Sequence, residues 1–228
     1  MDDRWLSLLQ LCDSNFPTGG FSHSFGLETY VEAGIVKDRA TFLLWLQTFV
    51  DKQLVPNDGL ACRLAFEWMK DDQYSKLLLL DARLFAQNVP RETREGNRRM
   101  GQRAAWLARD IFGTPRVVRY ADAIQRGEAT GHVALVFALV GIDLDIEKSD
   151  VVLSVLYAST ATLIQNGVRS IPLGQTEGQL LLRDMQAQLL SGTERVFALD
   201  QEELGAVPPG IEIAQMKHER LEGRMFMS

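Results

Sequence analysis

Hydrophobic residues recur along most of this chain with the three- and four-residue spacing of one α-helical face. The clearest stripe consists of Phe42, Trp45, Leu46, Phe49 and Val50. Asp38 is a suitable N-cap for this helix. Pro56 is expected to end it, because proline disfavours helical geometry in the residue before it. The pattern therefore predicts one helix between these two residues.

The same periodicity predicts further helices on both sides of this one. They are expected near residues 5–12, 58–70, 73–87, 91–112, 130–140 and 149–165. Thr176 and Gln179 form a T-x-x-Q capping box, which predicts another helix that reaches about Leu190. Strand signals are sparse, and only Val117–Tyr120 could form a short strand. The predicted fold class is all-α: a single helical, bundle-like domain of roughly ten helices with a C-terminal tail.

A stretch rich in proline and glycine, Gly205–Gly210, is typical of a linker. We therefore expect an all-helical domain over residues 1–210 and a partner-binding tail over residues 211–228. Near its end the tail carries Met225–Met227 among charged residues. Exposed methionine and phenylalanine suit an adaptable protein contact. A tail that packs back on its own domain is the simpler interpretation of the same residues.

The amino-acid composition argues against several classes of protein. Of the 228 residues, 46% are hydrophobic, which suffices for a sizeable core and excludes a wholly disordered chain. The formal net charge of −6 disfavours a globally basic nucleic-acid binder. Two cysteines cannot form a disulfide framework, and the apolar run at 133–142 is about half as long as a membrane-spanning helix. We expect a cytoplasmic protein that binds neither nucleic acid nor a membrane.

Motifs for catalysis are weak. The chain lacks a P-loop and a G-x-G-x-x-G fingerprint. Ser22 and His23 resemble part of a nucleophile elbow, but the G-x-S-x-G motif requires glycine where Ser24 stands. A free-standing helical hydrolase that uses Ser22 and His23 is therefore an alternative hypothesis with little support from the motif.

Histidines are too few and too far apart for a closed metal site. The chain has only His23, His132 and His218, whereas structural zinc sites usually need four nitrogen or sulfur ligands. For His132, in a predicted apolar helix, the simpler interpretation is a hydrogen-bonded core residue. We expect no tightly bound metal, with His23 as a weak candidate for transient metal contact.

Three polar stretches stand out. Residues 13–28, DSNFPTGGFSHSFGLE, and residues 166–179, NGVRSIPLGQTEGQ, combine turn residues with hydrogen-bonding side chains. Each could form a surface contact or a self-satisfied structural junction. Residues 91–126 contain nine arginines and only four acidic residues. That segment is either a solvated face or a docking surface for an acidic partner or a phosphate.

Four motifs occur in a specific order from about Leu8 to Ser228. They are FPTGGFSHSFGLE, RETREGNRRMGQ, VRSIPLGQTEGQ and MKHERLEGRMFMS. Together they resemble the UreF family of urease accessory proteins. The family commonly ends in Arg-Leu-Phe or Arg-Leu-Tyr, where this chain has Arg224, Met225 and Phe226. A change from leucine to methionine keeps the volume and the apolar character.

The resemblance implies an all-helical homodimer that is not an enzyme and serves as a nickel-insertion chaperone or scaffold. Such proteins bridge the accessory protein UreD, called UreH in some species, and the GTPase UreG. The assembly delivers nickel to apo-urease. By this resemblance the protein is expected to bind no cofactor stably, because nickel only passes through the assembly and GTP binds to UreG. An arginine supplied to that nucleotide, either Arg169 or one from residues 91–103, would also modulate GTP hydrolysis.

Residue roles carry over from the same motifs. In the family the tail becomes ordered against UreD, so the candidates for a UreD face are His218, Glu219, Arg220, Arg224 and Phe226. The candidates for contact with UreG or for nickel passage lie in the glycine-rich N-terminal stretch and near Arg169. They are Pro17, Gly19, Gly20, Phe21, Ser22, His23, Gly26, Glu28, Arg169, Pro172, Gly174 and Gln175.

Overall fold

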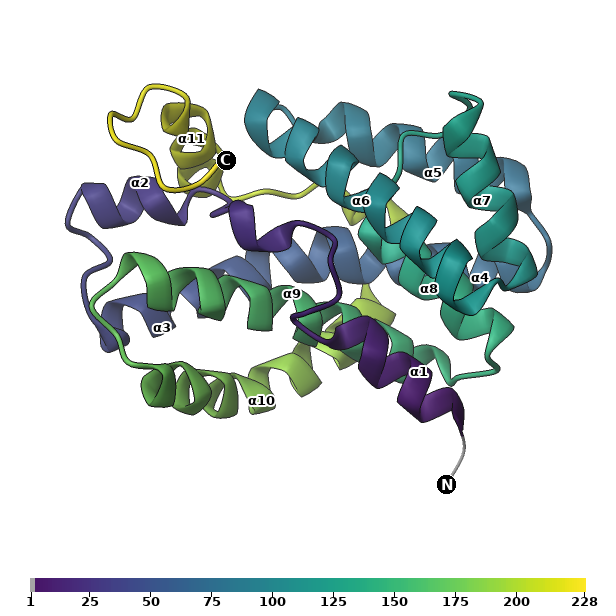
Figure 1. Ribbon diagram of the computed structural model, residues 1–228, viewed down its shortest axis with the longest axis horizontal. Coiled ribbons are helices and arrows are strands. Elements are labelled where there is room, and N and C mark those ends of the chain that lie inside the picture. Colours follow the sequence, from purple (N-terminus) through teal and green to yellow (C-terminus); the bar gives the residue numbers. More distant parts are fainter. Residues whose placement is uncertain (1–2) are drawn as a thin grey trace.

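The protein is an assembly of helices. The computed structural model describes residues 3–228, and that part of the chain contains no strand. The elements in chain order (Figure 1) are α1 (Asp3–Cys12), η1 (Gly20–Ser22), α2 (Leu27–Glu32), α3 (Arg39–Phe49), η2 (Val50–Gly59), α4 (Leu60–Lys70), α5 (Tyr74–Gln87), α6 (Arg91–Phe112), α7 (Pro115–Gln125), α8 (Val133–Asp143), α9 (Lys148–Ser170), α10 (Gln175–Ala198), η3 (Gln201–Glu203) and α11 (Pro209–His218). The predicted all-α fold class is confirmed.

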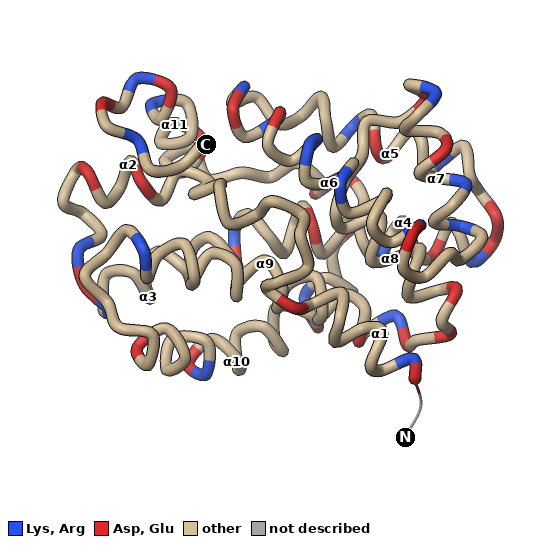
Figure 2. The backbone as a smooth tube through the Cα atoms, in the orientation of Figure 1, with Lys and Arg blue, Asp and Glu red and all other residues tan. Residues whose placement is uncertain are grey.

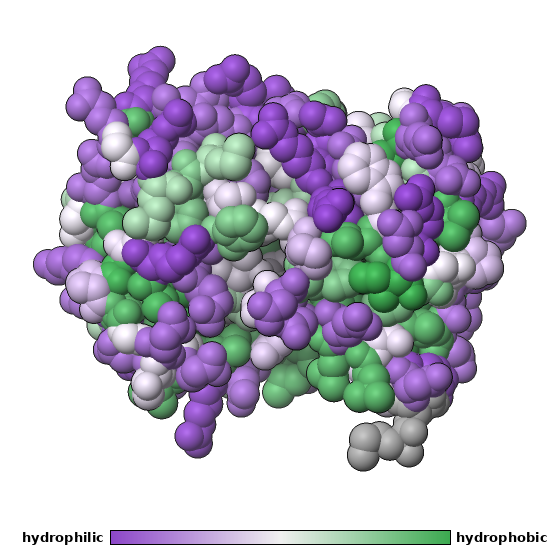
Figure 3. Space-filling view, in the orientation of Figure 1, coloured by the Kyte–Doolittle hydropathy of each residue, from purple (hydrophilic) through white to green (hydrophobic). Residues whose placement is uncertain are grey.

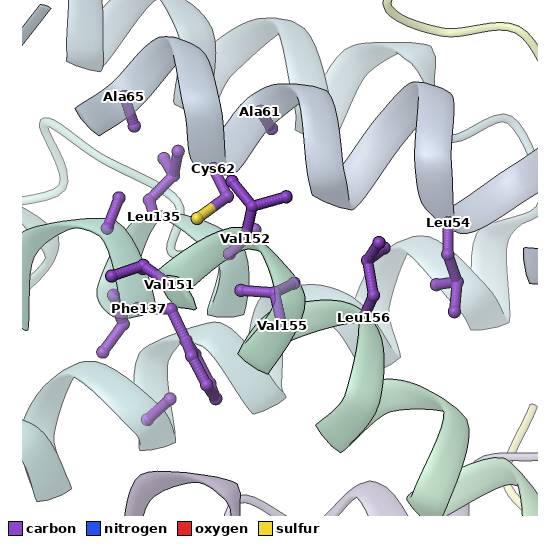
Figure 4. Close-up of a cluster of buried hydrophobic side chains, with 14 of the residues drawn as sticks. Leu54, Ala61, Cys62, Ala65, Leu135, Phe137, Val151, Val152, Val155 and Leu156 are labelled. Carbon is purple, nitrogen blue, oxygen red and sulfur yellow. The ribbon is translucent and has the colours of Figure 1, made fainter. Parts of the chain in front are cut away.

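Helix α8 forms the centre of the core. Every residue from Ala134 to Gly141 is buried, and the helix packs against α4, α6, α7 and α9. Figure 4 shows this region, where Cys62 of α4 and Val152 of α9 lie close to Leu135 of α8. Small residues allow close packing: a Cβ on Gly141 would lie 2.3 Å from a methyl group of Val151. The uninterrupted apolar run predicted from the sequence is thus a core helix.

One helix among residues 3–228, α9, has the length and apolar composition of a membrane span. Of its most apolar stretch, 56% is buried inside the structure. Its neighbours include α1, α8, α10 and η2, against which its buried side packs. This is the environment of a core helix, in which hydrophobic residues pack against other helices rather than lipid.

The prediction that Pro56 ends the third helix is wrong. Asp38 caps that helix as expected, accepting a hydrogen bond from the Thr41 amide at 2.9 Å. The helical path then continues through η2, a π-helical segment that contains Pro56 and leads directly into α4. A π-helix has a wider turn, which changes the carbonyl that the proline ring would otherwise approach. Burial of Leu54 and Val55 against α9 and α10 outweighs the local preference of proline.

Two other local predictions are also wrong. Val117–Tyr120 is helical rather than a strand, because it lies in α7, where Val117 and Tyr120 share a buried face. The capping residues of α10 precede the predicted box by two positions: Glu177 accepts a hydrogen bond from the Gly174 amide at 2.9 Å. That helix also extends to Ala198, beyond the expected end near Leu190.

Helix α1, expected near residues 5–12, spans Asp3–Cys12 and carries apolar residues on more than one face. Leu8 and Leu11 are the buried residues of α1, whereas Trp5 and Leu9 are exposed. Figure 3 shows hydrophobic surface over the region of α1 and the adjacent end of α6. Spacing alone could not choose between the faces of α1, because apolar residues occur on both sides of it.

His132 is not inside a helix, contrary to the prediction. It is the N-cap of α8, and its Nδ1 accepts a hydrogen bond from the Ala134 amide at 3.3 Å. The ring is half-buried rather than fully enclosed in the core. Helix α11 begins within the expected linker, at Pro209, and packs against α2 and α6. The end of the chain therefore lies beside the glycine-rich N-terminal stretch (Figure 1).

Candidate functional site

The glycine-rich segment, residues 17–28, connects α1 to α2 in a conformation that needs glycine. Gly19 and Gly26 have φ values of 92° and 90°, in the left-handed region that side chains disfavour. A Cβ on Gly26 would also lie 3.2 Å from the backbone nitrogen of Gln215 in α11. The segment thus brings backbone atoms of the N-terminal and C-terminal parts of the protein into close contact.

Helix α9 holds this segment through Asn166. Its side-chain amide donates to the carbonyl oxygens of Gly20, at 3.1 Å, and His23, at 2.8 Å. Arg169, one turn further along, donates to Asn166 Oδ1 at 2.7 Å and also to the carbonyl oxygen of Phe21. Asn166 is fully buried. The sequence marked Asn166 as a polar loop residue, but only the fold shows that it fixes the glycine-rich segment.

His218 lies at the centre of the contact between the tail and the body. Its side chain is fully buried. Nδ1 is 2.8 Å from Glu92 Oε2 on α6, and Nε2 is 2.8 Å from Glu28 Oε2 on α2. Glu28 also accepts hydrogen bonds from the backbone amides of Met225, at 2.6 Å, and Phe226, at 3.1 Å. One carboxylate therefore binds both α11 and the last residues of the tail.

Glu92 completes the contact. It accepts a hydrogen bond from Arg224 Nη1 at 2.7 Å in addition to its bond with His218. Partial burial opposes its ionisation, but the hydrogen bonds from His218 and Arg224 outweigh burial and hold the pKa of Glu92 below its ordinary value. Figure 2 shows acidic and basic positions alternating along the loop beside α11. Apart from its place in an arginine-rich motif, Glu92 has no sequence signal that points to this role.

The last four residues alternate between the surface and the interior. Phe226 and Ser228 are buried, whereas Met225 and Met227 are 58% and 54% exposed. The Arg169 guanidinium lies over the Phe226 ring, 5.0 Å from its centroid. This two-residue alternation is that of extended backbone. It directs two methionines outward on a firmly held backbone.

Residues 22–25 bind this extended end. The amide of Met227 donates to the carbonyl of Ser22 at 2.8 Å, and the amide of Ser24 donates to the carbonyl of Ser228 at 2.6 Å. His23 Nδ1 lies 2.8 Å from Ser228 Oγ. Burial, and then the charges of Arg99 and His218, lower the pKa of His23 to about 4. His23 is therefore a neutral, buried partner of the tail at neutral pH.

Ser22 and His23 do not form a catalytic pair in this geometry. Ser22 Oγ donates to the carbonyl of Gly19 at 2.7 Å. The His23 ring instead lies against Ser228 and Gly96, where a Cβ on Gly96 would be 2.7 Å from the imidazole. Their hydrogen bonds point to different partners, so the structure gives the hydrolase alternative no support.

The other predicted residues lie around this centre or outside it. Glu219 pairs with Arg91 at 3.1 Å, and Arg220 is exposed. Pro172, Gly174 and Gln175 form the exposed connection between α9 and α10. The fold thus joins the glycine-rich segment, Arg169 and the tail in one site, and the α9–α10 connection follows shortly after Arg169 along the chain.

A cavity of about 440 Å³ adjoins the glycine-rich segment. Its wall includes Phe16, Pro17, Gly20, Asp58, Met100 and His132. Asp58, which follows Pro56 in the π-helical segment, forms no ion pair within residues 3–228. Burial raises the pKa of Asp58, and the nearby His132 opposes this only in part. No motif in the sequence points to Asp58 itself, although a proline inside a helical pattern marks the unusual segment.

No group of three or more histidine, cysteine or acidic side chains in residues 3–228 is arranged to hold a metal ion. Cys12 lines the cavity, but burial, opposed by a hydrogen bond to the Ser154 carbonyl, raises its pKa to about 11. Its thiol is therefore protonated at neutral pH and is a poor metal ligand. The donor set of the described cavity suits weak, single contacts with a cation rather than tight coordination.

Comparison with known proteins agrees with the motifs. The family model UreF matches residues 36–186. The chain is 49% identical to "Urease accessory protein UreF" of Bacillus sp. (strain TB-90) over 226 residues, which is 99% of this chain and 100% of the relative. It is 46% identical to the protein of the same name from Lachnoclostridium phytofermentans over the full length of both chains.

A third relative, "Urease accessory protein UreF" of Geobacillus kaustophilus, is 47% identical over 227 residues, or 100% of this chain and 99% of the relative. The family model, the three relatives and the helical architecture agree, and the chain belongs to the UreF family.

Proposed function

We propose that this protein is a urease accessory protein that acts as a non-enzymatic chaperone for nickel insertion. It bridges UreD (UreH) and the GTPase UreG, so that nickel reaches apo-urease. The observation that carries this proposal is the convergence of the glycine-rich segment, Arg169 and the tail on one surface. Their polar groups bind one another, which suits a recognition surface and leaves no arranged nucleophile and base.

The docked tail supplies the UreD face in this proposal. His218, Glu28 and Glu92 hold the tail, while Met225 and Met227 point outward, and Phe21 of the glycine-rich segment is also 66% exposed. Methionine adapts its shape to a partner and contributes apolar contact area. The inward residues then act by fixing the backbone, and the outward ones touch the partner.

The second partner in this proposal is UreG. The protein acts as a homodimer in the cytoplasm. GTP binds to UreG alone. Arg99 and Arg103 on α6 are exposed and form no ion pair within residues 3–228, whereas Arg169 is occupied by Asn166 and Phe21. These two α6 arginines are therefore better placed than Arg169 to approach an acidic surface or a nucleotide of UreG and modulate its GTP hydrolysis.

The test is reconstitution with UreD, UreG and apo-urease. We expect size-exclusion chromatography with light scattering to give a dimer that binds UreD and then UreG. Nickel transfer to apo-urease should require GTP and should slow by at least about tenfold without this protein. Transfer at the same rate in its absence would contradict the bridging role. Esterase or amidase activity that disappears in Ser22→Ala would instead support the hydrolase alternative.

Nickel is cargo in this proposal, and the cavity beside the glycine-rich segment is its passage. Replacement of Asp58 by asparagine is expected to slow nickel transfer several-fold, because the cavity loses a half-buried carboxylate from its wall. The same variant should be more stable than the natural chain at neutral pH. Asp58 has a raised pKa in the folded state, so its penalty is absent at low pH and appears as pH rises through that folded pKa.

Urea unfolding between about pH 4 and pH 8 measures this difference. The stability gained by Asp58→Asn should grow with pH. Asp51→Asn is the control, because Asp51 lies in the same π-helical segment but pairs with Lys52 and Arg195. A gain that does not depend on pH, or unchanged nickel transfer, would remove the cation-passage role of Asp58.

A further inference from the structure

The buried imidazole of His218 faces two acceptors at once. Nδ1 is 2.8 Å from a Glu92 oxygen and Nε2 is 2.8 Å from a Glu28 oxygen. A neutral imidazole carries a proton on only one nitrogen, and an ionised carboxylate has no proton to donate. Both contacts are therefore hydrogen bonds only when His218 is the doubly protonated imidazolium.

The same two carboxylates seat the tail. Glu28 accepts the amides of Met225 and Phe226, and Glu92 accepts Arg224. The charge on His218 thus stabilises the two groups to which residues 224–226 are bound. We propose that His218 is a protonation-controlled latch that docks residues 219–228 on α2 and α6.

Charged and titratable groups surround the latch on every side that packs against it. From the body they are Glu28 on α2, Glu92 and Arg91 on α6, and His23 in the glycine-rich segment; from α11 and the tail they are Lys217, Glu219 and Arg224. Arg91 is paired with Glu219, and the buried His23 stays neutral down to about pH 4. His218 is consequently the cationic group at this contact on which both tail-binding carboxylates depend.

The direction in which docking of the tail changes with pH follows from the charges at this contact. With His218 protonated, His218 and Arg224 balance Glu28 and Glu92. Loss of the proton leaves one cation for two carboxylates and turns one ring lone pair toward a carboxylate oxygen, both costly in a buried place. Docking of the tail should weaken as pH rises through the range in which histidines titrate, about pH 6 to 8. If the proposed function holds, binding of UreD through the docked tail weakens in the same range.

Hydrogen–deuterium exchange on the isolated full-length chain tests the latch. The peptide covering residues 219–228 contains the amides of Met225, Phe226 and Met227, all hydrogen-bonded in the docked tail. After correction for intrinsic exchange, we expect their protection to fall about ten- to hundredfold between about pH 6 and 8, as for loss of a hydrogen bond to a charged group. Protection of peptides from α8 should stay constant.

Two variants make the mechanism specific. In His218→Gln the protection of the tail should be lower and independent of pH in this range. In Glu92→Gln the amide nitrogen can donate to unprotonated Nδ1 while its oxygen still accepts Arg224, so the tail should stay protected at higher pH. His132→Gln, which changes a histidine that caps α8 and makes no hydrogen bond to the tail within residues 3–228, should keep the natural pH dependence.

Two outcomes would overturn the proposal. One is protection of the tail that does not change with pH in the natural chain. The other is an unchanged pH dependence in His218→Gln with α8 still protected, which would place the titrating group elsewhere. Because the measurement needs no partner, its failure is separate from failure of the bridging role, which reconstitution with UreD and UreG tests.

Discussion

Replacement of Asp81 by alanine is expected to lower the free energy of unfolding by about 3–5 kcal/mol. Asp81 on α5 is 1% exposed. It accepts hydrogen bonds from the Tyr120 hydroxyl at 2.5 Å, from the amide and hydroxyl of Thr130 at 2.5 and 2.7 Å, and from the Gly131 amide at 3.0 Å. Alanine would leave these donors buried without an acceptor.

Replacement of Asp81 should change the structure beside the cavity as well as the stability of the core. Asp81 fixes Thr130 and Gly131, directly before His132, which caps α8 and lines the cavity. Burial, and then the charge of Asp81, raise the pKa of Tyr120 well above its ordinary value, so its hydroxyl remains a donor. The variant should therefore lose order at the start of α8 as well as stability.

Urea unfolding followed by circular dichroism measures the change in stability. Asp110→Ala is the control: Asp110 is 64% exposed in its pair with Arg109, and its loss should cost less than about 1 kcal/mol. Asp81→Asn should be intermediate, since an amide oxygen can still accept some of the bonds. Equal unfolding midpoints for Asp81→Ala and Asp110→Ala would show that the Asp81 network does not stabilise the fold.

Replacement of Phe226 by alanine is expected to undock the tail and to weaken UreD binding by at least about tenfold. The ring is 4% exposed and lies against the Arg169 guanidinium. Loss of a buried phenylalanine costs about 3–5 kcal/mol in protein interiors. Here the cost falls on docking of the tail, because the helices before residue 219 keep their own contacts. A partner that binds only the docked tail can bind only the fraction of molecules in which the tail remains docked.

Two measurements on the same variant separate docking from binding. Exchange protection at residues 225–227 should fall, and UreD affinity should fall with it. Glu222→Ala is the matched control, because Glu222 is an exposed tail residue without a hydrogen bond or ion pair within residues 3–228. Lost protection with unchanged UreD affinity would show that the free tail is the binding form. Unchanged protection would show that Phe226 does not hold the tail.

The local sequence predicted most helices because their burial follows helical periodicity. The stripe from Phe42 to Val50 is buried as expected, with Asp38 as the cap. Periodicity failed where packing opposed a local preference, as at Pro56, and where both faces of a helix carried apolar residues, as in α1. Val117–Tyr120 was too short for its β-branched residues to distinguish strand from helix.

The candidate site was predictable only as separate segments. The glycine-rich segment, Arg169 and the tail each had a signal of turn chemistry, polar residues or unusual composition. The site lies where residues about 140 to 200 positions apart meet, as in the bonds of Asn166 to Gly20 and of Ser24 to Ser228. Such contacts are long-range, so no spacing along the chain specifies them.

The sequence by itself determined that this protein is all-α and belongs with the UreF family, because helical periodicity and ordered motifs are local properties of the chain. Tertiary structure alone decided that His218 and Phe226 face inward, that Met225 and Met227 face outward, and that Asp58 borders a cavity. The physical reason is burial: the direction of a side chain and the charge that it bears depend on the neighbours that distant segments bring to it.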